Sequence, residues 1–270
     1  MIKIFRLSLI FIAVSILAFS GRQGVAGEGE KAQPSPVKAA VAAQLTPAKP
    51  ESTPELQPAE NVIPLSERKN VILLSKFYRG MNDDDVPKGW DLDDKKKPID
   101  ISLVKEGEQI AVRFKSEASA FGLYNEQDFD IRDYPILNWE WKVTQLPDGG
   151  NFLDEDKDDQ AAQVYISFGS LSFFNKPFVE AVGYYWSSTL PIGTEGECPT
   201  WGKSRAIVLE TGKTKLGEWV AEKRNVYKDY DKLFDDDDPS DVSALRLYTN
   251  SQHTKTGTEV FFRNIYFSKE

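Results

Sequence analysis

The stretch VGYYWSSTLPIG, residues 182–193, sets three aromatic residues side by side before two serines, a threonine and a Pro-Gly turn signal. Adjacent aromatic side chains can fill the core of a β-sheet, or they can lie under a flat ligand such as a sugar ring. Successive side chains of a strand point to opposite faces. Tyr184 and Trp186 therefore share one face, where we expect core, and Tyr185 and Ser187 share the other, which we expect to be more polar.

Residues elsewhere in the chain could complete a sugar site on that polar face. Such sites combine an aromatic plate with amide, carboxylate and guanidinium groups. Tyr165, Gln163 and Glu140 alternate with apolar residues in other strand-like segments, which places them on polar faces. The predicted ligand-binding residues are Glu140, Asp159, Gln163, Tyr165, Tyr185, Ser187, Arg224, Asn225 and Asp229.

The segment around Arg224 has two interpretations. Asn225 stands where a strand-like segment becomes helical, so it is a candidate N-cap, and Asp229 follows one turn later. Arg224 could pair with Asp229 or Asp159 as a buried support. Alternatively, the guanidinium and the carboxylate could form one end of a polar groove.

Three acidic residues at alternate positions, Asp154, Asp156 and Asp158, suggest a calcium loop. An EF-hand needs Gly at its sixth position and Glu at its twelfth. Asp159 and Tyr165 stand there instead, which excludes that motif and leaves either a looser calcium site or a solvated acidic turn. One His and one Cys make a zinc site improbable, and no other cofactor is expected.

No catalytic set stands out, so we expect a protein that is not an enzyme. His253 is the only histidine and Cys198 the only cysteine, and no G-x-S-x-G motif is present. The many acids leave a carboxylate pair for glycoside hydrolysis open. Glu140, between Trp139 and Trp141, is the acid most closely surrounded by aromatic residues.

The net charge limits the class of partner, and the N-terminal residues indicate the compartment. The chain has 42 acidic and 33 basic residues and a net charge of -9, which disfavours nucleic acid as a partner. Lys3 and Arg6 precede an apolar run over residues 7–19 that is shorter than the roughly 20 residues of a membrane span. We predict a secretory signal over residues 1–27, cut near Ala26–Gly27, and a periplasmic or secreted protein without stable membrane insertion. The alternative is an uncleaved anchor.

The remaining chain divides into a linker and one domain. Residues 28–69 are rich in Pro and Ala and contain no aromatic residue, so we predict a disordered linker. Residues 70–270 show mainly period-two patterns, as in ILNWEWKV (136–143) and AAQVYISF (161–168). Further strands are expected over residues 71–78, 110–115, 120–124, 205–210, 217–223, 242–248 and 259–267, with one helix over 225–234. This pattern predicts an all-β fold, a two-sheet antiparallel sandwich with one short helix.

Five segments occur in an order that resembles a known family. They are YPILNWEWKV, DDQAAQVYISF, GYYWSSTLPIGT, VLETGKTKLGEWVAEKRNVYKDYDKLF and RLYTNSQHT with the closing VFFRNIYF. The chain resembles, over about residues 77–267, the bacterial secreted family known only as domain of unknown function 3047. The resemblance implies a galactose-binding-like jelly roll and no established activity. The chain departs from the family pattern at YTNSQHT, where an Asp-rich segment is usual, and at Gln163, where Arg is usual.

Three functions follow in order of preference. The first is a non-catalytic binding module for a glycan or another polyhydroxylated ligand. The second is a structural or assembly protein of the cell envelope, which an exposed apolar patch would favour. The third is a polysaccharide hydrolase or lyase, which a deep cleft with two facing carboxylates would favour.

Overall fold

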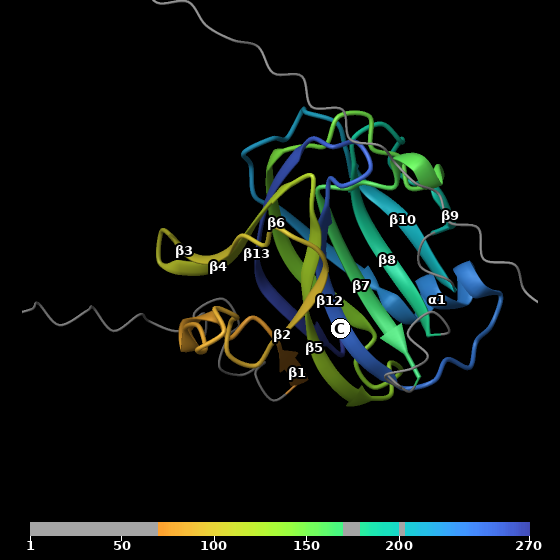
Figure 1. Cartoon of the computed structure of the whole chain (residues 1–270). Coiled ribbons are helices and arrows are strands. Elements are labelled where there is room, and N and C mark those ends of the chain that lie inside the picture. The colour runs from red at the N-terminus through yellow and green to blue at the C-terminus, as the bar shows by residue number, and fades with distance from the viewer. Residues whose placement is uncertain (1–69, 170–178, 200–202) are drawn as a thin grey trace, which may run out of the picture. The chain divides into compact units, whose positions relative to one another are not determined.

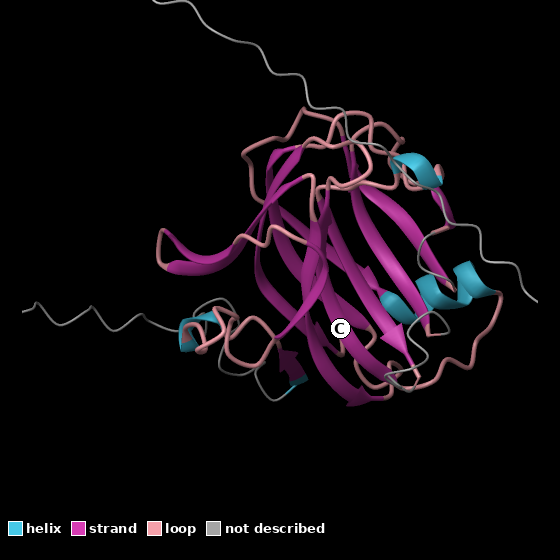
Figure 2. Cartoon of the chain, viewed as in Figure 1, coloured by secondary structure: helices cyan, strands magenta, loops and turns pink. Residues whose placement is uncertain are grey.

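The computed structural model describes residues 70–169, 179–199 and 203–270. The predicted signal (1–27) and linker (28–69) lie outside the described residues, so both stay predictions. Within the described ranges, no helix has the length and apolar character needed to cross a membrane. Strands arranged in two layers dominate the fold, with α1 (Val226–Phe234) beside them (Figure 2).

One layer is a six-stranded sheet in the order β11-β6-β13-β4-β3, with β1 paired to β13. All its pairings are antiparallel. Its strands are β1 (Val71–Leu73), β3 (Ile101–Glu106), β4 (Gln109–Glu117), β6 (Ile136–Gln145), β11 (Val220–Asn225) and β13 (Gly257–Ser268).

The other layer is a seven-stranded sheet in the order β2-β5-β12-β7-β8-β10-β9, which faces the viewer in Figure 1. Its strands are β2 (Asp91–Lys96), β5 (Ala120–Phe129), β7 (Ala162–Phe168), β8 (Glu180–Ser187), β9 (Glu195–Glu197), β10 (Ser204–Thr211) and β12 (Val242–Asn250). The prediction of a jelly-roll-like two-sheet sandwich is confirmed. One pairing differs from the antiparallel expectation, because β8 and β10 run parallel.

The strands that sequence reasoning missed lie at or near sheet edges. β2 and β9 are the outermost strands of one sheet and β3 ends the other. Edge strands commonly carry charged residues, as the sequences DLDDKK of β2 and EGE of β9 do. The hydrophobic alternation that marks interior strands is therefore absent. The first predicted strand is shorter than expected, because β1 ends at Leu73 and a 3-10 turn follows at Phe77–Arg79.

The main core lies between the sheets and contains two of the three aromatic residues of the triplet. Tyr184 and Trp186 of β8 have no exposed surface and belong to this core, as predicted. Trp186 packs against Trp141 of the opposite sheet with ring centroids 6.0 Å apart. Tyr184 and Trp186 therefore fill the core and are not available to a ligand.

The other face of the seven-stranded sheet is not the solvated face that the sequence predicts. Tyr165, Gln163, Tyr185 and Ser187 are each at most 2% exposed. Residues from the connection before β7 and from the described part of the chain after β8 fold over them. Phe152, from the connection before β7, meets the Tyr185 ring edge-on at 5.1 Å between centroids. The sequence pattern predicts which side chains lie on the second face of the strand, but it does not predict that other parts of the chain bury that face.

The connections that form this cover are tied to one another. The hydroxyl of Ser188 donates to the carbonyl of Pro147 at 2.6 Å, and that of Thr189 donates to the carbonyl of Gly150 at 2.8 Å. The residues they enclose form a second, smaller core on the outer face. Its members are Ala120, Phe152, Tyr165, Ala181, Tyr185, Cys198, Ala206, Val208 and Tyr248.

Candidate functional site

Strand register builds two rows of large polar side chains on the outer face of the seven-stranded sheet. Residues opposite one another on neighbouring strands share a face. Arg246 of β12 lies between Tyr124 of β5 and Tyr165 of β7, which forms the first row. In the second row, Gln163 of β7 lies between Tyr248 of β12 and Tyr185 of β8. We call these six residues the tyrosine rows.

Glycines make room for the rings of these rows. Gly183 is the β8 partner of Tyr165. A Cβ atom at Gly183 would lie 3.0 Å from Cε1 of Tyr165 and 3.1 Å from Cε1 of Tyr185. At Gly122, opposite Tyr248, a Cβ atom would lie 2.6 Å from Cδ2 of that tyrosine. The tyrosine rings therefore lie directly over the backbone of Gly183 and Gly122, in space that a side chain at either glycine would occupy.

A hydrogen-bond chain joins the second row to the end of the sandwich. The Tyr165 hydroxyl donates to Oε1 of Gln163 at 2.8 Å and also contacts the Tyr185 hydroxyl. Nε2 of Gln163 donates to Oδ1 of Asn250 at 2.7 Å. At the other end of this series of hydrogen bonds, the Tyr185 hydroxyl lies 3.0 Å from Sγ of Cys198. The side chains are thus held in fixed positions before any ligand arrives.

The electrostatics of this cluster keep its hydroxyls protonated. Burial, assisted by the nearby Asp158 carboxylate, raises the pKa of Tyr165 and Tyr185 well above the ordinary value. Burial also raises the pKa of the Cys198 thiol to about 12. At neutral pH the tyrosines remain hydrogen-bond donors, and Cys198 is a neutral thiol rather than a nucleophile.

The first row carries a fixed charged pair. Nη1 of Arg246 lies 3.3 Å from Oδ2 of Asp93, a residue of the edge strand β2, which pairs with β5. The guanidinium carbon is 5.7 Å from the centroid of the Tyr124 ring. Unlike the other members of the rows, Tyr124 is only partly buried, so its ring borders the open surface.

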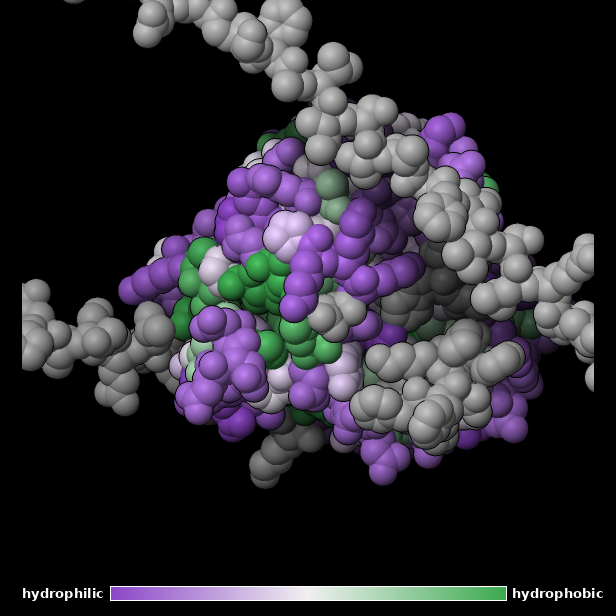
Figure 3. Space-filling model, in the orientation of Figure 1, coloured by the Kyte–Doolittle hydropathy of each residue, from purple (hydrophilic) through white to green (hydrophobic). Residues whose placement is uncertain are grey.

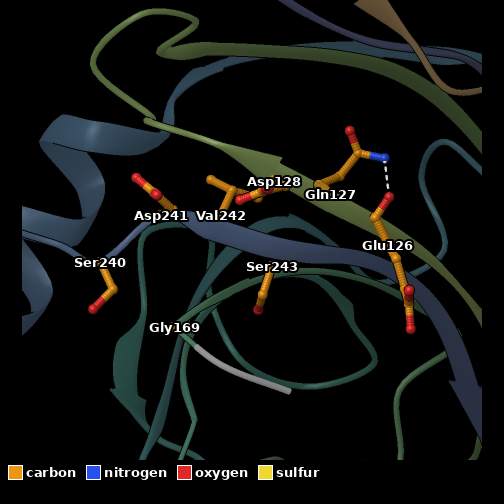
Figure 4. A pocket seen from close by; sticks show the side chains of 8 residues that line it. All are labelled: Glu126, Gln127, Asp128, Gly169, Ser240, Asp241, Val242 and Ser243. Carbon is orange, nitrogen blue, oxygen red and sulfur yellow. Dashed lines mark hydrogen bonds between the residues drawn. The ribbon is translucent and has the colours of Figure 1, made fainter. Parts of the chain in front are cut away.

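An open cavity of about 490 Å³ lies at one end of the same strands. Figure 4 shows its lining on β5, around the start of β12 and at the residue that follows β7. We call this cavity the acidic pocket, because its lining among the described residues contains three carboxylates and neither lysine nor arginine. Its lining residues are Glu126, Gln127, Asp128, Gly169, Ser240, Asp241, Val242 and Ser243.

The acidic pocket and the tyrosine rows belong to one strip of surface. Glu126 lies two residues beyond Tyr124 on β5, so the two side chains share a face. Glu126 is opposite Ala244, which in turn is opposite Ser167, two residues beyond Tyr165. The Ser243 hydroxyl donates to the carbonyl of Ser167 at 3.2 Å. The strip therefore passes from an open, carboxylate-lined end to a buried, tyrosine-lined end.

Three of the predicted site residues, Gln163, Tyr165 and Tyr185, come together in the tyrosine rows. Ser187 has a local structural contact instead. Its hydroxyl accepts from the backbone amides of Thr189 at 3.3 Å and Leu190 at 3.0 Å. It therefore fixes the turn that leaves β8.

Asp159 and Glu140 lie elsewhere than predicted. The Asp159 carboxylate accepts from the backbone amides of His253 at 3.2 Å and Thr254 at 2.6 Å, which anchors the β12–β13 connection. Glu140 belongs to the other sheet. It accepts from Nε of Arg263 at 2.6 Å and Nδ2 of Asn264 at 2.7 Å. The prediction that Glu140 shares one face with Tyr185 is wrong, because face alternation does not tell which sheet a strand joins.

The structure agrees with the first interpretation of the segment around Arg224, in which Arg224 and Asp229 form a supporting pair and Asn225 is an N-cap. Arg224 donates to both Asp229 oxygens, from Nε at 2.9 Å and from Nη2 at 2.5 Å. The Tyr184 hydroxyl donates to Oδ2 of Asp229 at 2.6 Å. Oδ1 of Asn225 accepts from the amide of Lys228 at 3.0 Å, so Asn225 is the N-cap of α1. Tyr184 faces the main core, so this cluster lies on the opposite side of the sheet from the strip.

The three aspartates proposed for calcium do not converge. Asp154 caps the 3-10 turn Glu155–Lys157 by accepting from the Asp156 amide, and it pairs with Lys157 at 3.0 Å. Asp158 is buried on the side of the tyrosine hydroxyls. Over the ranges that the structure describes, no three His, Cys, Asp or Glu side chains group closely enough to hold a metal ion.

Sequence reasoning missed the half of the strip that β5 and β12 supply. Both strands were predicted, but Tyr124, Arg246 and Tyr248 were not singled out. Alternation in VSALRLY, residues 242–248, places Arg246 and Tyr248 on one face and was a usable signal. The acids of the pocket carry no such signal, since they resemble those of any solvated loop.

The solved structures that resemble this chain include carbohydrate-binding and carbohydrate-degrading proteins. One is the family 11 carbohydrate-binding module of the cellulosomal cellulase Lic26A-Cel5E of Clostridium thermocellum. Its TM-score is 0.40 at 7% identity, over 73% of this chain and 94% of that one. Another is the xyloglucanase domain of NopAA from Sinorhizobium fredii, with a TM-score of 0.39 at 12% identity, over 67% and 94%. Likeness of this size does not establish function.

No curated protein matches the sequence. A family model matches residues 88–266, which include every strand of the sandwich except β1 and the last residues of β13. The chain therefore belongs to the family described as "Protein of unknown function (DUF3047)".

Proposed function

We propose that this protein is a non-catalytic binding module for a glycan or another polyhydroxylated ligand, which binds at the open, acidic end of the strip on the seven-stranded sheet. The observation that carries the proposal is that the partly exposed Tyr124 shares a strand face with Glu126, which lines the acidic pocket. A pocket of about 490 Å³ is within the range of small-molecule sites.

The lining offers the groups that a polyol needs. Carboxylates such as Glu126 and Asp241 accept hydrogen bonds from hydroxyl groups, and charge-assisted bonds of this kind are stronger than neutral ones. The hydroxyls of Ser240 and Ser243 can both donate and accept. Tyr124 provides an aromatic surface next to these groups, against which an apolar sugar face can pack.

Charge narrows the ligand class. Among the residues that the structure describes, three carboxylates and no basic residue line the acidic pocket. The nearest guanidinium of the strip, that of Arg246, is paired with Asp93. An anionic glycan would be repelled, so the ligand we propose is neutral.

Two observations argue against catalysis by the thiol or the imidazole. The only cysteine is a buried thiol whose pKa is raised to about 12. The only histidine, His253, lies in the β12–β13 connection, where its ring contacts Gln252 at 3.0 Å. Neither the Cys198 thiol nor the His253 imidazole is therefore placed to act as a nucleophile or a base.

The test is binding of the full chain to neutral and anionic polysaccharides by affinity electrophoresis and calorimetry. We expect at least one neutral glycan to bind, polygalacturonate to be excluded, and the double variant Glu126→Gln with Asp241→Asn to lose about tenfold or more in affinity. Glu117→Gln, an exposed site on β4, is the matched control and should bind as the parent does. Binding that survives the pocket variant would contradict the proposed site, and binding of no glycan would contradict the function.

A second candidate, a structural or assembly role, is favoured by one observation. An apolar groove lies between β3 and residues 81–92. In Figure 3 a green, hydrophobic area occupies the region of β3 and β4. Absence of glycan binding together with a protein partner bound at this groove would select this second function.

A further inference from the structure

The apolar groove has a volume of about 570 Å³ and lies away from the strip. Six apolar side chains contribute to its lining: Met81, Val86, Leu92, Ile99, Ile101 and Leu103. Of these, Leu92, Ile99, Ile101 and Leu103 are only partly buried, although they pack against the main core. The groove therefore leaves apolar surface in contact with water, which a partner could cover.

One wall of the groove is the edge of a sheet. Five consecutive residues, 99–103, line it. Because side chains of a strand alternate between faces, an unbroken run of lining residues means that the groove follows the strand edge. β3 is the last strand of its sheet, and among the described strands it pairs with β4 alone. The outer edge of β3 thus presents backbone N–H and C=O groups to the groove.

The opposite wall is held in place by local contacts. Met81 forms an isolated β-bridge with Pro87. Oδ1 of Asn82 accepts from the amides of Asp84 at 3.0 Å and Val86 at 2.9 Å. Because these contacts hold the wall in place beside the edge of β3, the apolar groove is formed before a partner binds.

Acidic residues accompany the apolar lining. Asp84 and Asp85 belong to the wall and are exposed, and Asp100 directly precedes β3. Asp100 is already paired with Arg113 at 3.2 Å, which leaves Asp84 and Asp85 as the charges that a partner would meet. The exposed Lys95, Lys96 and Lys97 are not part of the lining. The charge at the groove therefore favours a basic occupant.

We propose that this groove binds an extended segment of a partner protein that adds a strand to the free edge of β3. Alternate side chains of the segment are apolar and enter the groove, and lysine or arginine residues at its end meet Asp84 and Asp85. Main-chain hydrogen bonds to the β3 edge hold the segment, while the apolar positions and the basic end give specificity. This interaction is independent of glycan binding.

The probe for this site is the synthetic peptide Lys-Lys-Val-Thr-Val-Thr-Val-Thr, labelled for fluorescence anisotropy and titrated with the full chain. We expect saturable binding that weakens at high salt. Methylation of alternate peptide nitrogens, which removes backbone donors, should lower the affinity about tenfold or more. Replacement of the two lysines by glutamates should also lower it.

Variants locate the site. Asp84→Asn with Asp85→Asn should weaken binding of the basic peptide several-fold, whereas Asp236→Asn with Asp237→Asn, in the exposed stretch after α1, should leave it unchanged. Hydrogen exchange should show new protection in residues 101–106 when the peptide binds. Protection there without a change in α1 would support strand addition at β3.

Three results would overturn the proposal. Equal affinity for the plain and methylated peptides would exclude main-chain pairing. Concentration-dependent dimers that protect β3 without peptide would identify a second copy of this chain as the occupant. Peptide binding that occurs only after residues 28–69 are removed would identify the chain's own preceding segment as the occupant.

Discussion

Trp139 of β6 and Tyr184 of β8 stack across the interior of the sandwich, with ring centroids 5.3 Å apart and ring planes 27° apart. This contact joins the two sheets at the centre of the core. The Tyr184 hydroxyl continues to Asp229 of α1, and Asp229 in turn binds Arg224 of β11. One aromatic residue therefore links both sheets and the helix.

The aromatic triplet should stabilise the fold from both faces of β8. Trp186→Ala should cost about 3–5 kcal/mol, as large aromatic truncations in cores do. Tyr185 is equally buried, so Tyr185→Ala should cost about as much, and not far less as the alternation pattern alone suggests. Urea unfolding checks both values. Tyr227→Ala, on the partly exposed side of α1, is the control and should cost much less.

The Asp229 carboxylate should matter for the attachment of α1. Asp229→Asn weakens the two bonds from Arg224 and the bond from Tyr184, and we expect a loss of about 1.5–3 kcal/mol in unfolding free energy. Asp231→Asn, an exposed acid of the same helix, should have little effect. Equal effects of the two changes would show that the buried cluster adds no stability.

Stability should fall as pH rises because of Glu222. Burial, and then the negative charge of Glu210, raise the pKa of Glu222 to about 7 in the folded state, from an ordinary value of 4.5. Between these values the folded protein holds a proton that the unfolded chain has lost. The resulting stabilisation is fully present below about pH 4.5 and is lost as pH rises through about 7.

The variant Glu222→Gln separates this effect from the rest of the titration. The glutamine stays neutral, so the variant should gain stability relative to the parent between pH 5 and pH 8. Chemical denaturation at the two pH values measures the difference. Glu117→Gln, at an exposed site, should show no such gain, and a parallel response of both variants would contradict the assignment.

Gly183 should tolerate no side chain. A Cβ atom there would lie 3.0 Å from Tyr165, 3.1 Å from Tyr185 and 3.2 Å from the Ala206 Cβ, so Gly183→Ala should cost about 1–3 kcal/mol. Gly196→Ala is the matched control. The nearest atom there, at 2.5 Å, is a methyl group of Leu153, which is 47% exposed and can move away. Thermal unfolding should therefore show a large shift for the first change and a small one for the second.

Export stays a prediction of the sequence. The basic start and the short apolar run predict cleavage near Ala26–Gly27. Mass spectrometry of the protein from a bacterial periplasm or medium should find an N-terminus near that point. An intact Met1 in the membrane fraction would contradict cleavage and support the anchor.

The sequence by itself determined which side chains of the interior strands face inward. Apolar residues at alternate positions identify the core face, because only that face excludes water in every arrangement of the sheets. Tyr184, Trp186, Trp139 and Trp141 could be assigned to the core for this reason. The N-cap at Asn225 is equally local, since one side chain satisfies an amide three residues later.

Only the tertiary structure decided what the second face of each strand meets. Tyr185 and Glu140 have the same local pattern, yet one is buried under residues 146–161 and the other lies on the opposite sheet. The rows that join Tyr124, Arg246 and Tyr165 arise from pairings between strands far apart in the chain. Side-chain periodicity reports the environment of one strand, whereas a site on a sheet depends on which strands become neighbours and on which connections cover them.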